Sequence, residues 1–145
     1  MTQSEFFDAL ETRDPQQREQ DLLSRLPGLI GQAQQVAGWA HILSGVNAGD
    51  ITTRAALSQL PVTRKSALSA LQAQSAPFAG LNTTAPRELA RIFMSPGPIF
   101  DPQGRDGDWA NFARPLHALG ARAGHLIQNC YSYHFTPAAF MFIMN

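Results

Sequence analysis

Residues 91–104 have the sequence RIFMSPGPIFDPQG, in which two apolar runs flank the tetrapeptide Ser95-Pro96-Gly97-Pro98. Proline at the second position of a turn and glycine at the third favour a type II turn, in which the glycine takes a positive φ. The pattern therefore predicts a strand over Leu89–Met94, a tight turn, a short strand and a second turn over Asp101–Gly104.

A helical pattern follows, with apolar residues recurring at three- and four-residue steps. Asp106 or Asp108 can cap the start of this helix, Pro115 should kink it, and Gly120 supplies a stop signal. The apolar start of Leu126–Cys130, directly after the helix, predicts a further buried strand.

The chain before residue 77 has the pattern of about four helices with short connections. Asp14-Pro15 is a good helix start, because the aspartate can accept backbone N–H groups and proline loses no bond at the first helical position. Gly38 is expected to end the first long helix, and Asp50–Thr53 to cap a later one. Thr63 is expected to cap a helix over Arg64–Gln74.

The segment Ala76–Pro86 is a loop by composition and is the expected boundary between two parts. We expect residues 1–76 to form a helical lead-in, and residues 77–145 to form the start of an α/β nucleotide-binding subdomain. The predicted fold class is thus α/β.

Composition narrows the classes of function. Eleven acidic and eleven basic residues balance, so no global field favours nucleic acid or an anionic membrane surface. No apolar run approaches the length of a bilayer span, and the N-terminus lacks the pattern of a signal peptide. A single cysteine, Cys130, excludes an internal disulfide and fits a reducing compartment, so a cytoplasmic location is expected. No His or Cys has a partner at metal-ligand spacing, so no metal site is predicted.

The C-terminal residues indicate that the domain continues beyond Asn145. Thr136-Pro137 resembles a helix start, and the residues that follow, Phe140–Met144 above all, are almost wholly apolar. Such a helix needs a partner to cover it. We therefore expect an incomplete chain, and self-association or a complementary chain as partner through Phe140–Met144.

Five segments carry a resemblance to a known family. They are Glu11–Asp14, Leu60–Leu68, Arg91–Gly97, Gly120–Asn129 and Tyr131–Pro137. In this order and spacing they resemble the N-terminal part of the phenylacetate–CoA ligase-like branch of the adenylate-forming enzymes. The resemblance implies activation of a small carboxylic acid, such as an aryl acid, by ATP with Mg²⁺, followed by transfer of the acyl group to coenzyme A.

The resemblance also implies site residues. Ser95 and Gly97 match the start of the family's phosphate-binding loop, which usually runs Ser-Ser-Gly-Thr-Thr-Gly-Lys-Pro. Pro96 and Pro98 each delete a backbone donor there and Asp101 would repel a phosphate, so we expect weak ATP binding. Arg91 or Arg105 could supply a cation.

Tyr131, Tyr133 and His134 could line an aryl-acid pocket, since ligands of open α/β sheets bind beyond the carboxyl ends of strands. The competing interpretation is a plain structural turn over Ser95–Pro98 and ordinary aromatic packing of the tyrosines. The family's catalytic lysine would lie beyond Asn145, so no catalytic residue is assigned.

Two hypotheses follow. In the first, the chain is the N-terminal fragment of an ATP-dependent acid–CoA ligase, inactive alone and binding no cofactor tightly. In the second, it is a non-catalytic helical interaction module that docks through its apolar C-terminal helix.

Overall fold

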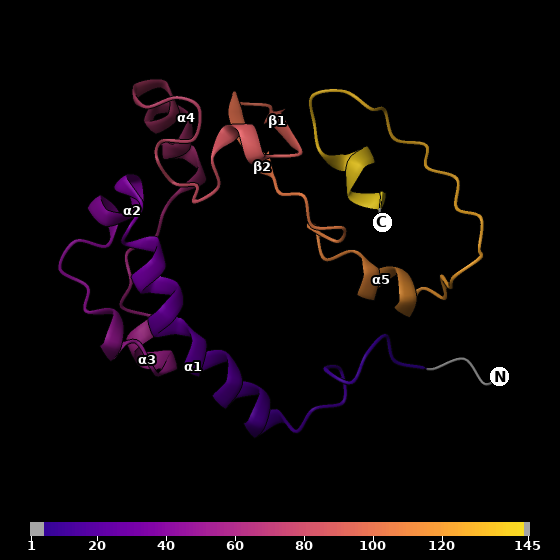
Figure 1. Ribbon diagram of the computed structural model, residues 1–145, viewed down its shortest axis with the longest axis horizontal. Helices are drawn as coiled ribbons and strands as arrows, with labels where there is room; N and C mark the ends of the chain where they lie inside the picture. Colours follow the sequence, from indigo (N-terminus) through magenta and orange to yellow (C-terminus); the bar gives the residue numbers. More distant parts are fainter. Residues whose placement is uncertain (1–4, 144–145) are drawn as a thin grey trace.

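The computed structural model describes residues 5–143 and has a mixed α/β composition (Figure 1). Four helices from the first half of the chain gather on one side of a two-stranded sheet. The shorter helices of the C-terminal part lie on the other side. In chain order the elements are α1 (Pro15–Ala33), α2 (Ala37–Ile42), the 3-10 helix η1 (Ala48–Asp50), α3 (Arg54–Leu57), α4 (Lys65–Gln74), η2 (Pro86–Glu88), β1 (Arg91–Ser95), β2 (Ile99–Gln103), α5 (Ala113–Ala118) and η3 (Ala138–Phe142).

The first helix begins as its sequence predicts. The Asp14 carboxylate accepts hydrogen bonds from the N–H groups of Gln16 and Gln17, at 3.0 and 2.9 Å, and Pro15 occupies the first turn. These bonds satisfy donors that have no partner inside the helix. Near its other end α1 buries Ile30, which forms a small apolar core with two residues of the following segments, Leu43 and Ile51.

Helix starts further along were predicted with mixed success. Thr53 does cap α3, because its hydroxyl accepts from the N–H of Ala56 at 3.1 Å. The prediction for Thr63 is wrong by one residue, since α4 begins at Lys65 and the position before it, Arg64, makes no side-chain cap.

The prediction that Gly38 ends the first helix is wrong, because α1 ends at Ala33 and Gly38 lies inside α2. Its N–H donates to the carbonyl of Gly80 at 2.9 Å, so the loop after α4 lies directly on α2. A Cβ at this position would lie 2.4 Å from the Ala79 carbonyl oxygen. Here glycine is required by close approach of two backbones and not by a helix stop.

The sheet is an antiparallel hairpin of β1 and β2, joined by the predicted turn. Gly97 has φ +134°, in the region that favours glycine. The second predicted turn, over Asp101–Gly104, is wrong, because Asp101, Pro102 and Gln103 continue β2. Pro102 is tolerated there because it lies in an edge strand, where a missing N–H leaves no interior ladder bond unmade.

The outer edge of β2 is bonded to the side chain of Gln72 from α4. The Gln72 amide nitrogen donates to the Phe100 carbonyl at 2.9 Å, and its oxygen accepts from the Phe100 N–H at 2.8 Å. Gln72 is 7% exposed, so both bonds are sheltered from water. A glutamine side chain thus takes the place of a neighbouring strand and attaches the hairpin to the helical part.

The C-terminal part departs furthest from the predicted pattern. The predicted cap at Asp106 or Asp108 is wrong, because α5 begins only at Ala113 and its N-cap position is Phe112, which makes no side-chain cap bond; the Asp108 carboxylate accepts from the Phe112 N–H at 2.7 Å. Gly120 ends it with φ +93°, as predicted. Residues 126–130 form no strand, and Leu126 is fully exposed. A strand needs a neighbouring strand to bond its backbone groups. Within residues 5–143 the sheet consists of β1 and β2, and residues 126–130 pair with neither.

Substituting Gly38 and Gly28 in parallel tests the close approach at α2. Gly38→Ala forces a methyl group against two backbone carbonyls, so we expect a loss of about 1–3 kcal/mol in the free energy of unfolding. Gly28 lies in α1, where an added Cβ meets nothing within 4 Å. Gly28→Ala should therefore gain about 0.5–1 kcal/mol, as alanine does inside helices. Urea unfolding followed by circular dichroism measures both, and equal effects would contradict the packing described.

Candidate functional site

The predicted phosphate-binding residues lie at the tip of the hairpin. Ser95 ends β1, is half-buried and donates its hydroxyl to the Ile99 carbonyl at 3.3 Å. Gly97 is exposed in the turn between two prolines, which have no N–H to offer. The turn therefore presents few donors, and the Ser95 hydroxyl is already engaged in closing it.

The segment with the predicted acid-binding residues reaches β1 from the other side of the hairpin. The Met94 N–H donates to the Phe135 carbonyl at 2.9 Å. Met94 is opposite Phe100 in the register, in the pair whose backbone groups point away from the hairpin. This one bond brings Phe135, and with it the neighbouring residue His134, next to Met94, one residue before Ser95.

The rings of Tyr131 and Tyr133 pack against residues of η3. The Tyr131 ring stacks on Phe142 with centroids 5.6 Å apart, and Tyr133 meets Phe140 edge-on at 5.1 Å. Both tyrosines stay more than half exposed, at 56% and 55%. His134 is exposed, and its Nδ1 accepts from the Thr136 N–H at 3.4 Å.

A cluster of aromatic rings joins this segment to β1. Phe93 of β1 is 3% exposed and contacts both Trp109 and Phe140, with ring centroids 5.8 and 5.3 Å apart. Phe112 meets Phe142 edge-on at 5.0 Å. The apolar C-terminal segment is thus in contact with rings of its own chain; Met144, the last residue of the predicted docking segment, lies outside the described residues.

Asn129 holds the tyrosine segment in place and was not singled out from the sequence. Its amide nitrogen donates to the Tyr133 hydroxyl at 3.0 Å and to the Ala139 carbonyl at 2.8 Å. Its oxygen accepts from the Tyr131 N–H at 3.0 Å. The last bond is an Asx-type turn, which an asparagine two residues before an aromatic could have indicated.

The candidate cations lie away from the turn. Arg91 pairs with Gln103 at the open end of the hairpin, and its guanidinium lies 4.6 Å from the centre of the Phe140 ring. Arg91 lies four positions before Ser95 along the strand, which corresponds to about 13 Å. Arg105 donates to the carbonyls of Glu88 and Leu89. Neither arginine therefore neutralises a phosphate at the turn in this arrangement.

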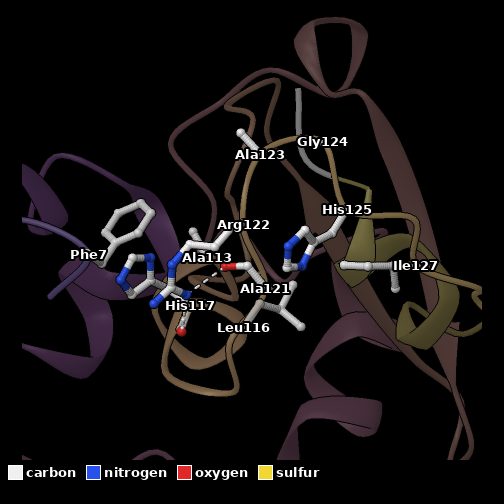
Figure 2. A pocket seen from close by; sticks show the side chains of 10 residues that line it. All are labelled: Phe7, Ala113, Leu116, His117, Ala121, Arg122, Ala123, Gly124, His125 and Ile127. Atoms are coloured by element: carbon white, nitrogen blue, oxygen red, sulfur yellow. Dashed lines mark hydrogen bonds between the residues drawn. The ribbon is translucent and has the colours of Figure 1, made fainter. Parts of the chain in front are cut away.

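A cavity of about 380 Å³ lies between α5, the loop that follows it and Phe7 (Figure 2). Its lining contains none of Ser95, Gly97, Tyr131, Tyr133 or His134. Among residues 5–143 no three potential metal ligands cluster. In the same part of the chain, no helix combines the length and hydropathy required to cross a bilayer.

In comparisons with known proteins, no family model, no curated protein and no solved structure matches the chain.

Substitution of Asn129 tests its role in placing the tyrosines. Asn129→Leu removes three hydrogen bonds and leaves the Ala139 carbonyl, on a fully buried residue, without its donor. We expect a loss of about 1–3 kcal/mol in the free energy of unfolding. The neighbouring residue Gln128 is exposed, so Gln128→Ala should change stability by no more than about 0.5 kcal/mol. Chemical denaturation followed by tryptophan fluorescence compares them; an unaffected Asn129→Leu protein would refute the role assigned to Asn129.

Proposed function

We propose that this chain is the N-terminal portion of an ATP-dependent carboxylic acid–CoA ligase that works through an acyl-adenylate. In the proposal, the hairpin tip with Ser95 and Gly97 contacts phosphate, and the segment with Tyr131, Tyr133 and His134 contacts the acid. The chain alone binds both ligands weakly and does not turn over.

The observation that carries the proposal is the 2.9 Å hydrogen bond from the Met94 N–H to the Phe135 carbonyl. An adenylating enzyme must hold the carboxylate beside the α-phosphate, because the new bond joins the two. The bond puts Phe135, directly after the residues assigned to the acid, beside the strand that ends in Ser95, one of the residues assigned to phosphate. The two sets are about 35 residues apart in sequence, so their adjacency does not follow from local structure alone.

The chemistry of the tip supports weak binding. Phosphate loops rely on successive backbone N–H groups, and Pro96 and Pro98 remove two of them. Each charge-assisted hydrogen bond lost corresponds to about 1.5–3 kcal/mol. In a complete enzyme Mg²⁺ would offset the phosphate charge.

The alternative function, docking on a partner through Phe140–Met144, has less surface available. Phe140 contacts Phe93 and Tyr133, and Phe142 contacts Phe112 and Tyr131. Among the described residues of this segment, Ile143 is an exposed aliphatic residue, at 40%. A partner would have to displace intramolecular aromatic contacts, so we place the ligase proposal first.

A substitution that restores a donor tests the nucleotide site. Pro98→Thr returns one N–H and adds one hydroxyl at the tip, so we expect Mg·ATP to bind about tenfold more tightly than to the parent chain. Calorimetry measures the affinities, and amide shifts at Gly97 locate the ligand. Pro61→Thr makes the same chemical change at an exposed proline between α3 and α4 and should leave ATP binding unchanged.

Phenylacetate tests the acid half by the same methods. It should shift the amides of Tyr131 and Tyr133, and the shifts should grow when Mg·ATP is present, because the two ligands lie side by side. If neither ligand moves these amides, in the parent or in Pro98→Thr, the ligase assignment fails. Concentration-dependent self-association without ligand binding would favour the docking module instead.

A further inference from the structure

The cavity beside α5 has the size and the lining of a small-molecule site. It measures about 380 Å³, within the usual range for ligand pockets, and its walls are mainly apolar (Figure 2). Leu116 of α5 and Ile127 supply aliphatic walls, and Phe7 supplies an aromatic one. A ligand of this size with a flat apolar body fits such walls.

The polar side chains of the lining are one guanidinium and two imidazoles. They belong to Arg122, His117 and His125, and among the described residues the lining contains no carboxylate. In Figure 2 the Arg122 guanidinium lies beside His117, and the His125 ring lies beside Ile127. A lining with a guanidinium and imidazole N–H donors, and with no carboxylate among the described residues, favours an anion.

Arg122 is held in position by the end of α5. Its Nη1 donates to the carbonyl of His117 at 2.6 Å and to that of Ala121 at 2.8 Å. These bonds fix the guanidinium before any ligand arrives, so little side-chain entropy remains to be lost on binding. The carbonyls at a helix C-terminus also favour a cation there.

The segment before α1 completes the cavity. Phe7 packs edge-on against His117, with ring centroids 5.7 Å apart. Arg114 of α5 holds this segment through ion pairs with Asp8 and Glu11, and its guanidinium lies 5.6 Å from the centre of the Phe7 ring. A contact between residues 106 positions apart therefore provides one wall of the site.

We propose that this cavity binds a small organic anion: one carboxylate, or a similar monoanionic group, on a compact apolar body. The anionic group meets Arg122 and His125, and the apolar body lies against Phe7, Leu116 and Ile127. The site is separate from the hairpin tip and from Tyr131–His134, and it stands or falls independently of the ligase proposal.

Sodium benzoate and neutral benzamide form a matched pair of probes. Titrating each into ¹⁵N-labelled protein should give saturable shifts at the amides of Ala123, Gly124 and Ile127 with benzoate, and binding at least about tenfold weaker with benzamide. Equal affinity for the two probes would overturn the anionic preference. Absence of saturable shifts at these amides, or shifts confined to residues 131–135, would overturn the site.

Variants divide the roles of charge and apolar wall. His125→Gln and Arg122→Gln should each weaken benzoate binding several-fold and leave benzamide binding unchanged, because neither removes apolar wall. Phe7→Ala should weaken both probes. The control His41→Gln changes an exposed histidine of α2 and should alter neither. Arg122 also donates to carbonyls at the end of α5, so Arg122→Gln removes bonds that support the fold. If Arg122→Gln unfolds the protein, His125→Gln decides the outcome. Unchanged benzoate binding in His125→Gln would contradict the proposal.

Discussion

The two hydrogen bonds between the Gln72 side chain and the backbone of Phe100 connect the two parts of this protein. A two-stranded hairpin is marginal by itself in water, since its outer edges leave backbone groups without partners. Gln72 satisfies both groups of Phe100 at the outer edge of β2, and it does so from the buried side of α4. Its amide is well suited to this, because its NH2 group donates and its carbonyl oxygen accepts, as the two polar groups of a peptide do.

The candidate site depends on the same hairpin. With β2 attached to α4, β1 presents its own outer edge to the C-terminal part, where Met94 donates to Phe135. The side chain of Phe93, the preceding residue, lies on the opposite face of the sheet from that of Met94. It is buried against Trp109 and Phe140. One short strand therefore contributes a backbone bond to the tyrosine segment and an aromatic ring to the core beneath it. The arrangement of Ser95, Tyr131 and Tyr133 follows from the placement of β1.

Features determined by neighbouring residues could be predicted from the sequence. The caps by Asp14 and Thr53 and the positive φ of Gly97 and Gly120 depend on a few adjacent positions, and they were expected. Features that depend on distant partners could not. The predicted strand over Leu126–Cys130 finds no strand to pair with in the described part of the chain, and the close approach at Gly38 involves a loop about 40 residues away. Gln72 carries no motif that marks it as a bridging residue, and the sequence around Asn129 indicates its local turn but not its bond to Ala139.

Hydrogen exchange at the Phe100 amide tests the Gln72 bridge most directly. Phe100 faces away from its partner strand, so without Gln72 its N–H would be open to solvent. The account predicts that this amide exchanges as slowly as the core amides of α4, and that Gln72→Leu accelerates it to the rate of an open loop. Gln74→Leu, a change at an exposed position of the same helix, should not affect it. A Phe100 amide that exchanges rapidly in the parent protein, or that stays equally protected in Gln72→Leu, would contradict the account.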